Sequence, residues 1–472
     1  MRTVIQSFRS VKVVFFVLLA LAILASIWLP YTEFYREWRF EGKAKIREGG
    51  VRVEVINSSP ENKVTLAPSS PSGFTPQVRL GYTSGDQWEP AIASDRFGHV
   101  YVLYPQYLGV PGCPTCPNPT MILVISSDRG VTWAAPRQIA PPGTGQWDAQ
   151  IVVDAIDGQT VYASWLQNGK SDIVVAKSID FGATWSVVTA DSTNASTDKP
   201  ILVVRGKDVY VGYNHAQQVW VTSSHDSGAT FTEVKINQNG KLGWSLAGGG
   251  TITPDGSVYF SWNGYEGNGG AKGNVNLYIS KSTDGGITWT TKLLAISSSP
   301  PDCSAFSCGW AFLGAAITMT SDSSGNLYAL WNAGSAAKGP ERIYFSKSTD
   351  SGNTWSAKVD VSAAPAGTHH AFPAIVAGAA GDVRISWMDA RAPGSLWNTY
   401  YRSSLDGGAT WSAEADLSTY VAGYGYIQPD GFNFPFGDYY EMDIDDQGTT
   451  HVIWGEGLNY DGPGSIWYAT GR

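Results

Sequence analysis

An octapeptide of the form Ser-x-Asp-x-Gly-x-Thr-Trp recurs through this chain and constrains its fold more than any other feature. Its Asp side chain can accept hydrogen bonds from the backbone N–H groups of a turn, and its Gly supplies a positive φ. The final Trp is large enough to wedge between neighbouring sheets. The sequence therefore predicts six hairpin turns, of which the third ends in Phe: SSDRGVTW (126–133), SIDFGATW (178–185), SHDSGATF (224–231), STDGGITW (282–289), STDSGNTW (348–355) and SLDGGATW (404–411).

A second repeat is an alternating strand that ends in Trp or Tyr. Each unit around it can be divided into an inner strand, a turn, a second strand, a loop, a third strand, the octapeptide turn and a fourth strand. A four-stranded antiparallel unit repeated in this way is typical of a propeller blade. The seven copies favour seven blades, whereas the octapeptides alone would give six. The copies are residues 99–104, 160–165, 208–213, 257–262, 326–331, 382–387 and 449–454.

The seventh unit ends at its third strand, residues 466–470, and no octapeptide follows. A blade that lacks its outer strand can be completed by the beginning of the chain, which closes the ring. Two segments, 51–56 and 76–80, have the alternating pattern that such a strand needs.

Composition agrees with an all-β fold. The chain has 53 Gly, 25 Pro and 19 Trp with only 15% charged residues, and such Gly- and Pro-punctuated aromatic sequences are typical of sandwiches, barrels and propellers. The net charge of -9 argues against a nucleic-acid partner, because neutralising phosphates requires clustered Lys and Arg.

The N-terminus predicts one transmembrane helix. Residues 11–29 are apolar except for Lys12 and Ser26, and basic residues begin the chain. We expect a signal anchor at 11–29 with residues 1–10 in the cytoplasm, a stalk at 30–75 and the propeller domain at 76–472. The alternative is a cleaved signal peptide and a secreted protein. Both interpretations place the propeller outside the cytoplasm.

The four cysteines form two close pairs, Cys113 with Cys116 and Cys303 with Cys308. In an oxidising compartment such pairs predict two local disulfides. A four-Cys zinc site is the alternative and would need the two loops to meet. We expect no metal and no cofactor.

The octapeptide resembles the Asp-box, or bacterial neuraminidase, repeat of the sialidase superfamily, and the resemblance covers roughly residues 85–472. It implies a propeller in which the Asp boxes lie on the face opposite the active site, so that the box aspartates are structural. Sialidases also have an Arg-Ile-Pro segment, which this chain lacks, and three arginines that grip a carboxylate. Arg79, Arg342 and Arg391 could reach one face here. Seven-bladed Asp-box relatives include carbohydrate-active enzymes, assembly factors and binding receptors.

The loops opposite the boxes hold the candidate site residues. As catalytic groups we expect Asp389, Glu441 or Asp438 as acid or base and Arg391 as a clamp on the substrate. Carboxylates and aromatic rings in these loops suit a polysaccharide, because rings stack on sugar faces. The expected substrate-binding residues are Trp88, Glu89, Trp147, Asp148, His370, Trp397 and Tyr439.

Several of these residues have structural alternatives. Trp88 and Trp147 occupy matching places in two units and could pack between blades. Asp389 and Arg391 could form an ion pair that fixes a loop. The insertion 419–440 is rich in Gly and aromatic residues and is a candidate lid or specificity loop.

The sequence thus predicts a membrane-anchored, extracytoplasmic sialidase-like propeller that acts on glycans, as a glycoside hydrolase with a carboxylate pair. The alternative is a non-catalytic propeller at the cell surface that binds a carbohydrate or a protein partner.

Overall fold

The computed structural model describes residues 73–139, 143–193, 197–237, 245–267, 273–300, 314–392, 396–418, 427–428, 431–432, 439–457 and 464–472. Every regular element in these residues is a β-strand, and none of them forms a helix long and apolar enough to cross a membrane. The expected anchor at 11–29 and nearly all of the expected stalk lie outside the described residues.

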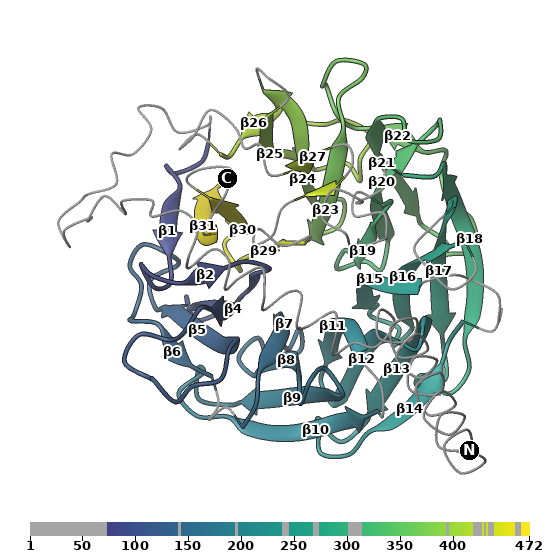
Figure 1. Cartoon of the computed structure of the whole chain (residues 1–472). Coiled ribbons are helices and arrows are strands. Elements are labelled where there is room, and N and C mark those ends of the chain that lie inside the picture. Colours follow the sequence, from purple (N-terminus) through teal and green to yellow (C-terminus); the bar gives the residue numbers. More distant parts are fainter. Residues whose placement is uncertain are drawn as a thin grey trace, which may run out of the picture. The chain divides into compact units, whose positions relative to one another are not determined.

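Seven sheets are arranged in a ring as the blades of a propeller, which confirms the seven-blade prediction over the six-blade alternative (Figure 1). Each blade has four strand positions, with the inner strand of one blade packed against the inner strand of the next. Blade 1 consists of β2 (Asp86–Gln87), β3 (Ala91–Ser94), β4 (Val100–Tyr107), β5 (Thr120–Ser126) and β6 (Arg137–Gln138), in which β2 and β3 share the inner position.

Blades 2 to 6 each run from an inner strand to an outer strand in chain order. Blade 2 is β7 (Gln146–Val153), β8 (Val161–Gln167), β9 (Asp172–Ser178) and β10 (Ser186–Ser192); blade 3 is β11 (Thr197–Arg205), β12 (Asp208–His215), β13 (Gln218–Ser224) and β14 (Thr232–Lys235); blade 4 is β15 (Ser245–Ile252), β16 (Val258–Tyr265), β17 (Val275–Ser282) and β18 (Thr290–Ser297); blade 5 is β19 (Ile317–Ser321), β20 (Leu327–Gly334), β21 (Glu341–Ser348) and β22 (Val359–Asp360); blade 6 is β23 (His370–Ala377), β24 (Val383–Ala392), β25 (Leu396–Ser404) and β26 (Ala415–Asp416).

Blade 7 closes the ring with a strand from the beginning of the propeller. Its strands β29 (Glu441–Ile444), β30 (Thr450–Gly457) and β31 (Gly464–Gly471) are followed by β1 (Val78–Leu80), which pairs with β31 in the register Val78 with Tyr468. The predicted closing strand at 76–80 is therefore confirmed, and the other candidate, 51–56, lies outside the described residues. Phe74 already packs on the propeller, with its ring 4.7 Å from that of Tyr401.

The Asp boxes form the predicted turns between the third and fourth strands. In the first box, Asp128 Oδ1 accepts hydrogen bonds from Ser126 Oγ (2.8 Å) and the Thr132 N–H (2.8 Å), while Oδ2 accepts from Thr132 Oγ1 (2.6 Å). The same hydrogen bonds recur in the other five boxes. Because they stabilise the ionised carboxylate, they lower the pKa of each box aspartate, to about 2 in the second, fourth and fifth boxes. The box aspartates are therefore structural.

The aromatic residue that ends a box packs between blades. The ring of Trp133 in blade 1 meets that of Tyr468 in blade 7 at 4.9 Å, and Trp411 in blade 6 meets Phe345 in blade 5 at 5.0 Å. These contacts extend the buried clusters that join neighbouring sheets and explain why each box ends in Trp or Phe.

The boxes define one end of the propeller, which we call the box face. The turns between inner and second strands lie at the same end, because Arg129 N–H donates to Gly98 O and Ser227 N–H donates to Lys207 O. The opposite end, the loop face, carries the loops that lead into each inner strand and those between second and third strands.

Most inner strands contain a β-bulge near the loop face. The register shifts between Trp147 and Gln150 in blade 2, between Asp198 and Ile201 in blade 3, and at matching places in blades 4 and 6. The bulge residues Glu89, Asp148, Lys199 and Phe372 have φ between 52° and 57°, a region that non-glycine residues seldom adopt. The bulges thereby re-aim the side chains at this end of the strands.

Two further sequence predictions concern the loops. Cys113 and Cys116 form the predicted disulfide, whereas Cys303 and Cys308 lie outside the described residues. Of the insertion 419–440, the structure describes Tyr439, Tyr440 and a two-stranded sheet of β27 (Ile427–Gln428) and β28 (Gly431–Phe432).

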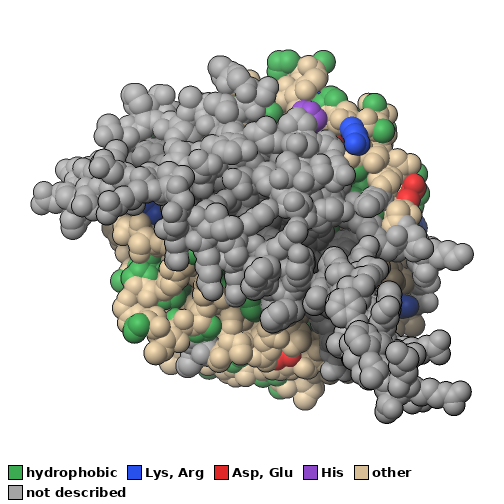
Figure 2. All heavy atoms as spheres, in the orientation of Figure 1, with side chains coloured by type: hydrophobic (Ala, Val, Ile, Leu, Met, Phe, Trp, Pro, Cys, Tyr) green, Lys and Arg blue, Asp and Glu red, His purple; other side chains and the backbone are tan. Residues whose placement is uncertain are grey.

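Charged side chains are sparse on the visible part of the described surface. In the space-filling view, the Lys, Arg, Asp and Glu side chains that can be seen are isolated among apolar and other polar atoms (Figure 2). This distribution matches the low charged fraction of the sequence.

Candidate functional site

Side chains from four blades meet at Lys199, at the loop-face end of the inner strands. Lys199 Nζ lies 3.7 Å from Glu89 Oε1 of blade 1 and 4.5 Å from the centre of the Tyr439 ring of blade 7. The Lys199 backbone N–H donates to Asp148 Oδ2 of blade 2 at 3.3 Å. We call Glu89, Asp148, Asp198, Lys199 and Tyr439, together with Lys170, the Lys199 cluster.

The fold explains why these residues meet. Glu89, Asp148 and Lys199 each lie six residues before the turn that ends their inner strand, at Asp95, Asp154 and Arg205. They therefore occupy one register around the ring, and all three are bulge residues with positive φ. Such backbone strain in three neighbouring blades is a feature that often accompanies functional sites.

The cluster is charged, with Glu89 and Asp148 buried and its other members partly buried. The side chains of Glu89 and Lys199 are 4% and 15% exposed, and Lys170 pairs with Asp198 at 3.7 Å. Burial raises the pKa of Asp148 to about 6, Lys170 and Lys199 oppose this rise, and the negative charge of Asp198 adds to it. A carboxyl group with this pKa changes protonation state close to neutral pH.

An aromatic pair adjoins these carboxylates. The rings of Trp88 and Tyr107 stack at 4.5 Å with an interplanar angle of 8°. Burial raises the pKa of the Tyr107 hydroxyl well above its usual value, and the carboxylates of Glu89, Asp148 and Asp86 raise it further. Tyr107 therefore lies close to the Lys199 cluster.

Trp88 is buried against Tyr107, and Trp147 packs on the apolar cluster between blades 2 and 3. Trp147 therefore packs between blades, as its structural alternative predicts, whereas the stacking of Trp88 on Tyr107 lies within blade 1.

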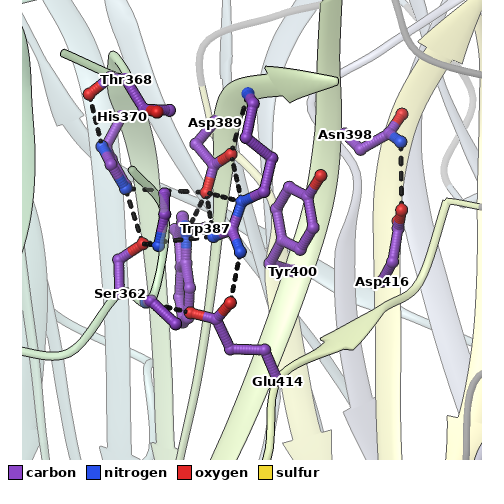
Figure 3. A network of polar contacts seen from close by, with 12 residues as sticks. Ser362, Thr368, His370, Trp387, Asp389, Asn398, Tyr400, Glu414 and Asp416 are labelled. Carbon is purple, nitrogen blue, oxygen red and sulfur yellow. Dashed lines mark hydrogen bonds and ion pairs between the residues drawn. The ribbon is translucent and has the colours of Figure 1, made fainter. Parts of the chain in front are cut away.

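The predicted catalytic residues Asp389 and Arg391 belong to a separate network between blades 5 and 6 (Figure 3). Arg391 Nε donates to Asp389 Oδ1 at 2.8 Å, Arg391 Nη1 pairs with Glu414, and the guanidinium carbon lies 3.9 Å from the centre of the Tyr400 ring. Asp389 is fully buried and also accepts a hydrogen bond from Trp387 Nε1 at 2.8 Å. Both residues thus have the contacts of an ion pair that fixes a loop.

The bond from Trp387 to Asp389 recurs elsewhere in the ring. In blade 7, Trp454 Nε1 donates to Glu456 Oε2 at 2.8 Å, and in blade 2, Trp165 Nε1 donates to Gln167 Oε1 at 3.3 Å. In each case the acceptor lies two residues after the Trp that ends the second strand. Asp, Glu and Gln thus make the same structural contact at this position of three blades.

His370 joins the same network. Its Nδ1 lies 2.9 Å from the backbone carbonyl of Glu341 and its Nε2 lies 2.8 Å from Ser362 Oγ. Because a carbonyl can only accept, Nδ1 carries the proton and Nε2 accepts the Ser362 hydroxyl. Burial lowers the pKa of His370 to about 4, so the ring is neutral at neutral pH. Trp397 is likewise buried, in the apolar cluster that joins blades 6 and 7.

Glu441 links three blades near the axis of the ring. Its Oε2 accepts the Ile92 N–H at 3.2 Å and its Oε1 accepts Gln150 Nε2 at 2.5 Å, and Gln150 Oε1 in turn accepts the Leu202 N–H at 3.3 Å. Glu441 and Gln150 each lie four residues before the turn that ends their strand, so they play equivalent parts in blades 7 and 2. Burial raises the pKa of Glu441 to about 8.

The other predicted residues, which are two arginines and Asp438, do not all lie at one site. Arg79 hydrogen-bonds to the backbone of Tyr82 and Thr83. Arg342 pairs with Asp360, and Arg342 and Arg391 both donate to Ser362, at its backbone carbonyl and at its Oγ respectively. Asp438 lies outside the described residues. Within the described ranges, no group of three or more His, Cys, Asp or Glu is arranged to hold a metal ion.

The sequence places Glu89, Asp148, Tyr439 and the pair Asp198-Lys199 in loops of one face, but it does not single out Lys199 as the residue at which the others meet. Lys170 was not among the residues that the sequence pointed to. The signal that could have found Lys199 is its register, which matches that of Glu89 and Asp148 once the inner strands are aligned on their turns.

The fold and the six boxes define a sialidase-like propeller built from neuraminidase-type repeats. A family model, the BNR repeat-like domain, matches residues 47–310, which is more than half of the chain. The chain belongs to this family.

Several solved structures share the fold at low sequence identity, and no curated protein matches the chain. A protein of unknown function from Dyadobacter fermentans is 15% identical, with 84% of this chain and 98% of that chain covered and a TM-score of 0.48. The NanB sialidase from Streptococcus pneumoniae is 13% identical, with 84% and 70% covered and a TM-score of 0.45. YCF48 bound to a D1 peptide is 13% identical, with 88% and 99% covered and a TM-score of 0.46.

Proposed function

We propose that this chain is a membrane-anchored, extracytoplasmic propeller that binds a glycan at the Lys199 cluster. The observation that carries the proposal is the meeting of Glu89, Asp148 and Tyr439 at Lys199, each from a different blade. Carboxylate and ammonium groups can accept from and donate to sugar hydroxyls, and an aromatic ring can stack on a sugar face.

The site also fits a ligand from outside the cell. It lies on the loop face, where the blades present loops rather than the satisfied turns of the boxes. The apolar run 11–29, preceded by Arg2 and Arg9, supports an anchor that leaves the propeller outside the cytoplasm.

One observation favours glycoside hydrolysis as a second candidate function. Asp148, with its pKa raised to about 6, keeps a proton in part at neutral pH and can act as a general acid. Glu89 supplies a second carboxylate at Lys199, and two carboxylates in unlike surroundings are the arrangement that glycosidases use. Asp389 and Glu441 are not part of this candidate, because Asp389 is bonded to Arg391 and Trp387 within blade 6 and Glu441 links blade 7 to blades 1 and 2.

Binding to a panel of neutral, anionic and amino polysaccharides tests the main proposal. The full chain in detergent micelles should bind at least one class, and Glu89→Gln should weaken that binding about tenfold because a charged hydrogen-bond partner is lost. Glu233→Gln, on the exposed outer strand β14, is the matched control and should bind like the wild type. A folded full chain that binds none of the panel would contradict the proposal.

Turnover of aryl glycosides tests the second candidate. If Asp148 is the acid, hydrolysis should decline as the pH rises through about 6, since the protonated form is lost. Asp148→Asn should then reduce the rate by roughly a hundredfold while the protein still binds its ligand. Binding without any turnover in the wild type would leave the binding function alone.

A further inference from the structure

The most exposed large apolar side chains of the described residues all lie on the box face. They are between 53% and 78% exposed, whereas the other exposed large apolar residues are 37–52% exposed and lie on outer strands or, for Leu108, after β4. Boxes 1, 2, 4 and 6 and the turns that end the inner strands of blades 1 and 2 supply them: Phe97, Val131, Ile156, Ile179, Ile287 and Leu405.

Four of these residues form one neighbourhood in blades 1 and 2. The turn that holds Phe97 contacts the turn of Ile156, because Arg96 Nη1 donates to Ile156 O at 3.3 Å. Gln159, which follows the turn of Ile156, donates through Nε2 to Ile179 O at 3.2 Å. The box that contains Val131 contacts the turn of Phe97, because Arg129 N–H donates to Gly98 O. Ile287 and Leu405 lie farther around the ring, in blades 4 and 6.

The chain reaches the propeller at this same face and beside the same blades. Phe74 pairs with Gly471, at the box-face end of β31, and Arg472 N–H donates to Gly73 O at 3.1 Å. The neighbouring Tyr468 packs against Trp133 of box 1 at 4.9 Å. Gly73 and Phe74, at the start of the described chain, therefore lie at the box face on blade 7, which adjoins blade 1.

We propose that the box face rests on the surface of the bilayer in which the chain is anchored, with the six apolar side chains at the lipid interface. The inference rests on the membrane anchoring in the proposed function. Apolar tips in blades 1, 2, 4 and 6 can be covered together by a planar partner, whereas a segment of chain would cover only part of them. The anchor keeps the face near the membrane, so even weak contacts suffice.

Charge on the box face selects the kind of lipid surface. The carboxylates of the six box aspartates are ionised because their pKa values are lowered, and Arg129 is already paired with Asp445 and Asp446. Six ionised carboxylates on this face disfavour an anionic membrane, which attracts clusters of basic residues. A zwitterionic phosphatidylcholine surface is the suitable partner.

The orientation places the Lys199 cluster on the side away from the membrane. The loop face is the opposite end of the same ring, so a glycan outside the cell would reach it without passing the lipid surface. The apolar box face and the polar loop face then serve different partners.

Lipid-depth quenching of the full chain in phosphatidylcholine vesicles tests this inference. A fluorophore is attached to a single added cysteine, in Val131→Cys, in Ile179→Cys or in the control Leu293→Cys, whose site is half exposed on the outer strand β18. With brominated acyl chains, fluorescence at 131 and 179 should fall by roughly half, and fluorescence at 293 should stay nearly constant.

Three results would overturn the inference, and they are distinguishable. Equal quenching or none at the three positions, in chain that floats with the vesicles, contradicts the contact while the anchor stands. If the fluorophores at 131 and 179 are protected from aqueous iodide but are not quenched by the brominated lipid, the stalk and not the bilayer covers the box face. If the chain fails to float with the vesicles, it has no membrane anchor. Glycan binding by the chain in micelles would still test the proposed site.

Discussion

At the scale of single residues, Asp389 and Glu441 differ most from their predicted catalytic roles. Both are acids near the loop face, and an acid there is a natural candidate for catalysis. In the structure Asp389 holds Trp387 and Arg391, and Glu441 accepts hydrogen bonds from blades 1 and 2. The ion pair of Asp389 with Arg391 is the structural alternative that the sequence offers, because the two residues are close in the chain. The partners of Glu441 come from distant parts of the chain, so a sequence pattern could not reveal them.

Replacing Asp389 distinguishes a structural role of this residue from a role in ligand binding or catalysis. Asp389→Ala should lower the free energy of unfolding by about 3–5 kcal/mol, because it leaves Arg391 partly buried without one of its two paired acids. Glycan binding by the folded variant should stay within about threefold of the wild type. Urea unfolding and a binding titration check the two quantities; normal stability with lost binding would contradict our interpretation.

Glu441 should make stability depend on pH. Its pKa is raised in the folded protein from the ordinary 4.5 to about 8, so the folded state keeps a proton that the unfolded state releases between these values. Stability should therefore decrease as the pH rises from about 4.5 to 8. Glu441→Gln removes the ionisation and uses the residue found at the same register in blade 2. It should reduce that decrease by ~2–4 kcal/mol in urea unfolding at pH 5 and pH 8. An unchanged pH dependence would show that Glu441 does not hold the proton.

At the scale of the element, the blades could be predicted from sequence because their signals are local. Each box carries its own turn chemistry, and each second strand alternates and ends in a large aromatic residue. The closing strand β1 was also predictable, since blade 7 ends at its third strand. The bulges were not, because the left-handed conformations of Glu89, Asp148 and Lys199 occur at three unlike residues. The sequence therefore indicated the fold and which loops share a face, but not which side chains meet there.

The closing strand should matter more for stability than its three residues suggest. Leu80 is buried in the cluster between blades 7 and 1, so Leu80→Ala should lower the free energy of unfolding by about 2–4 kcal/mol. Val187→Ala, on the exposed outer strand β10, should lower it by less than about 1 kcal/mol. Comparable unfolding midpoints for the two variants would indicate that β1 does not close the ring.

At the scale of the whole molecule, ring closure brings residues far apart in sequence to one axis. Tyr439 in blade 7 reaches Lys199 in blade 3 only because blade 7 is followed in the ring by blades 1 and 2. The same closure places the start of the propeller at the box face. One geometric feature thus sets both the candidate glycan site and the orientation that we propose toward the membrane.

The most direct test of the glycan site is a comparison of two lysines that contact tyrosine rings. Lys199 lies 4.5 Å from the centre of the Tyr439 ring at the axis, and Lys358 lies 4.2 Å from that of Tyr344 in blade 5. We would titrate the full chain, Lys199→Met and Lys358→Met with the polysaccharide that the wild type binds. Our account predicts binding about tenfold weaker or worse for Lys199→Met, and unchanged binding for Lys358→Met. Wild-type affinity in a folded Lys199→Met protein would contradict it.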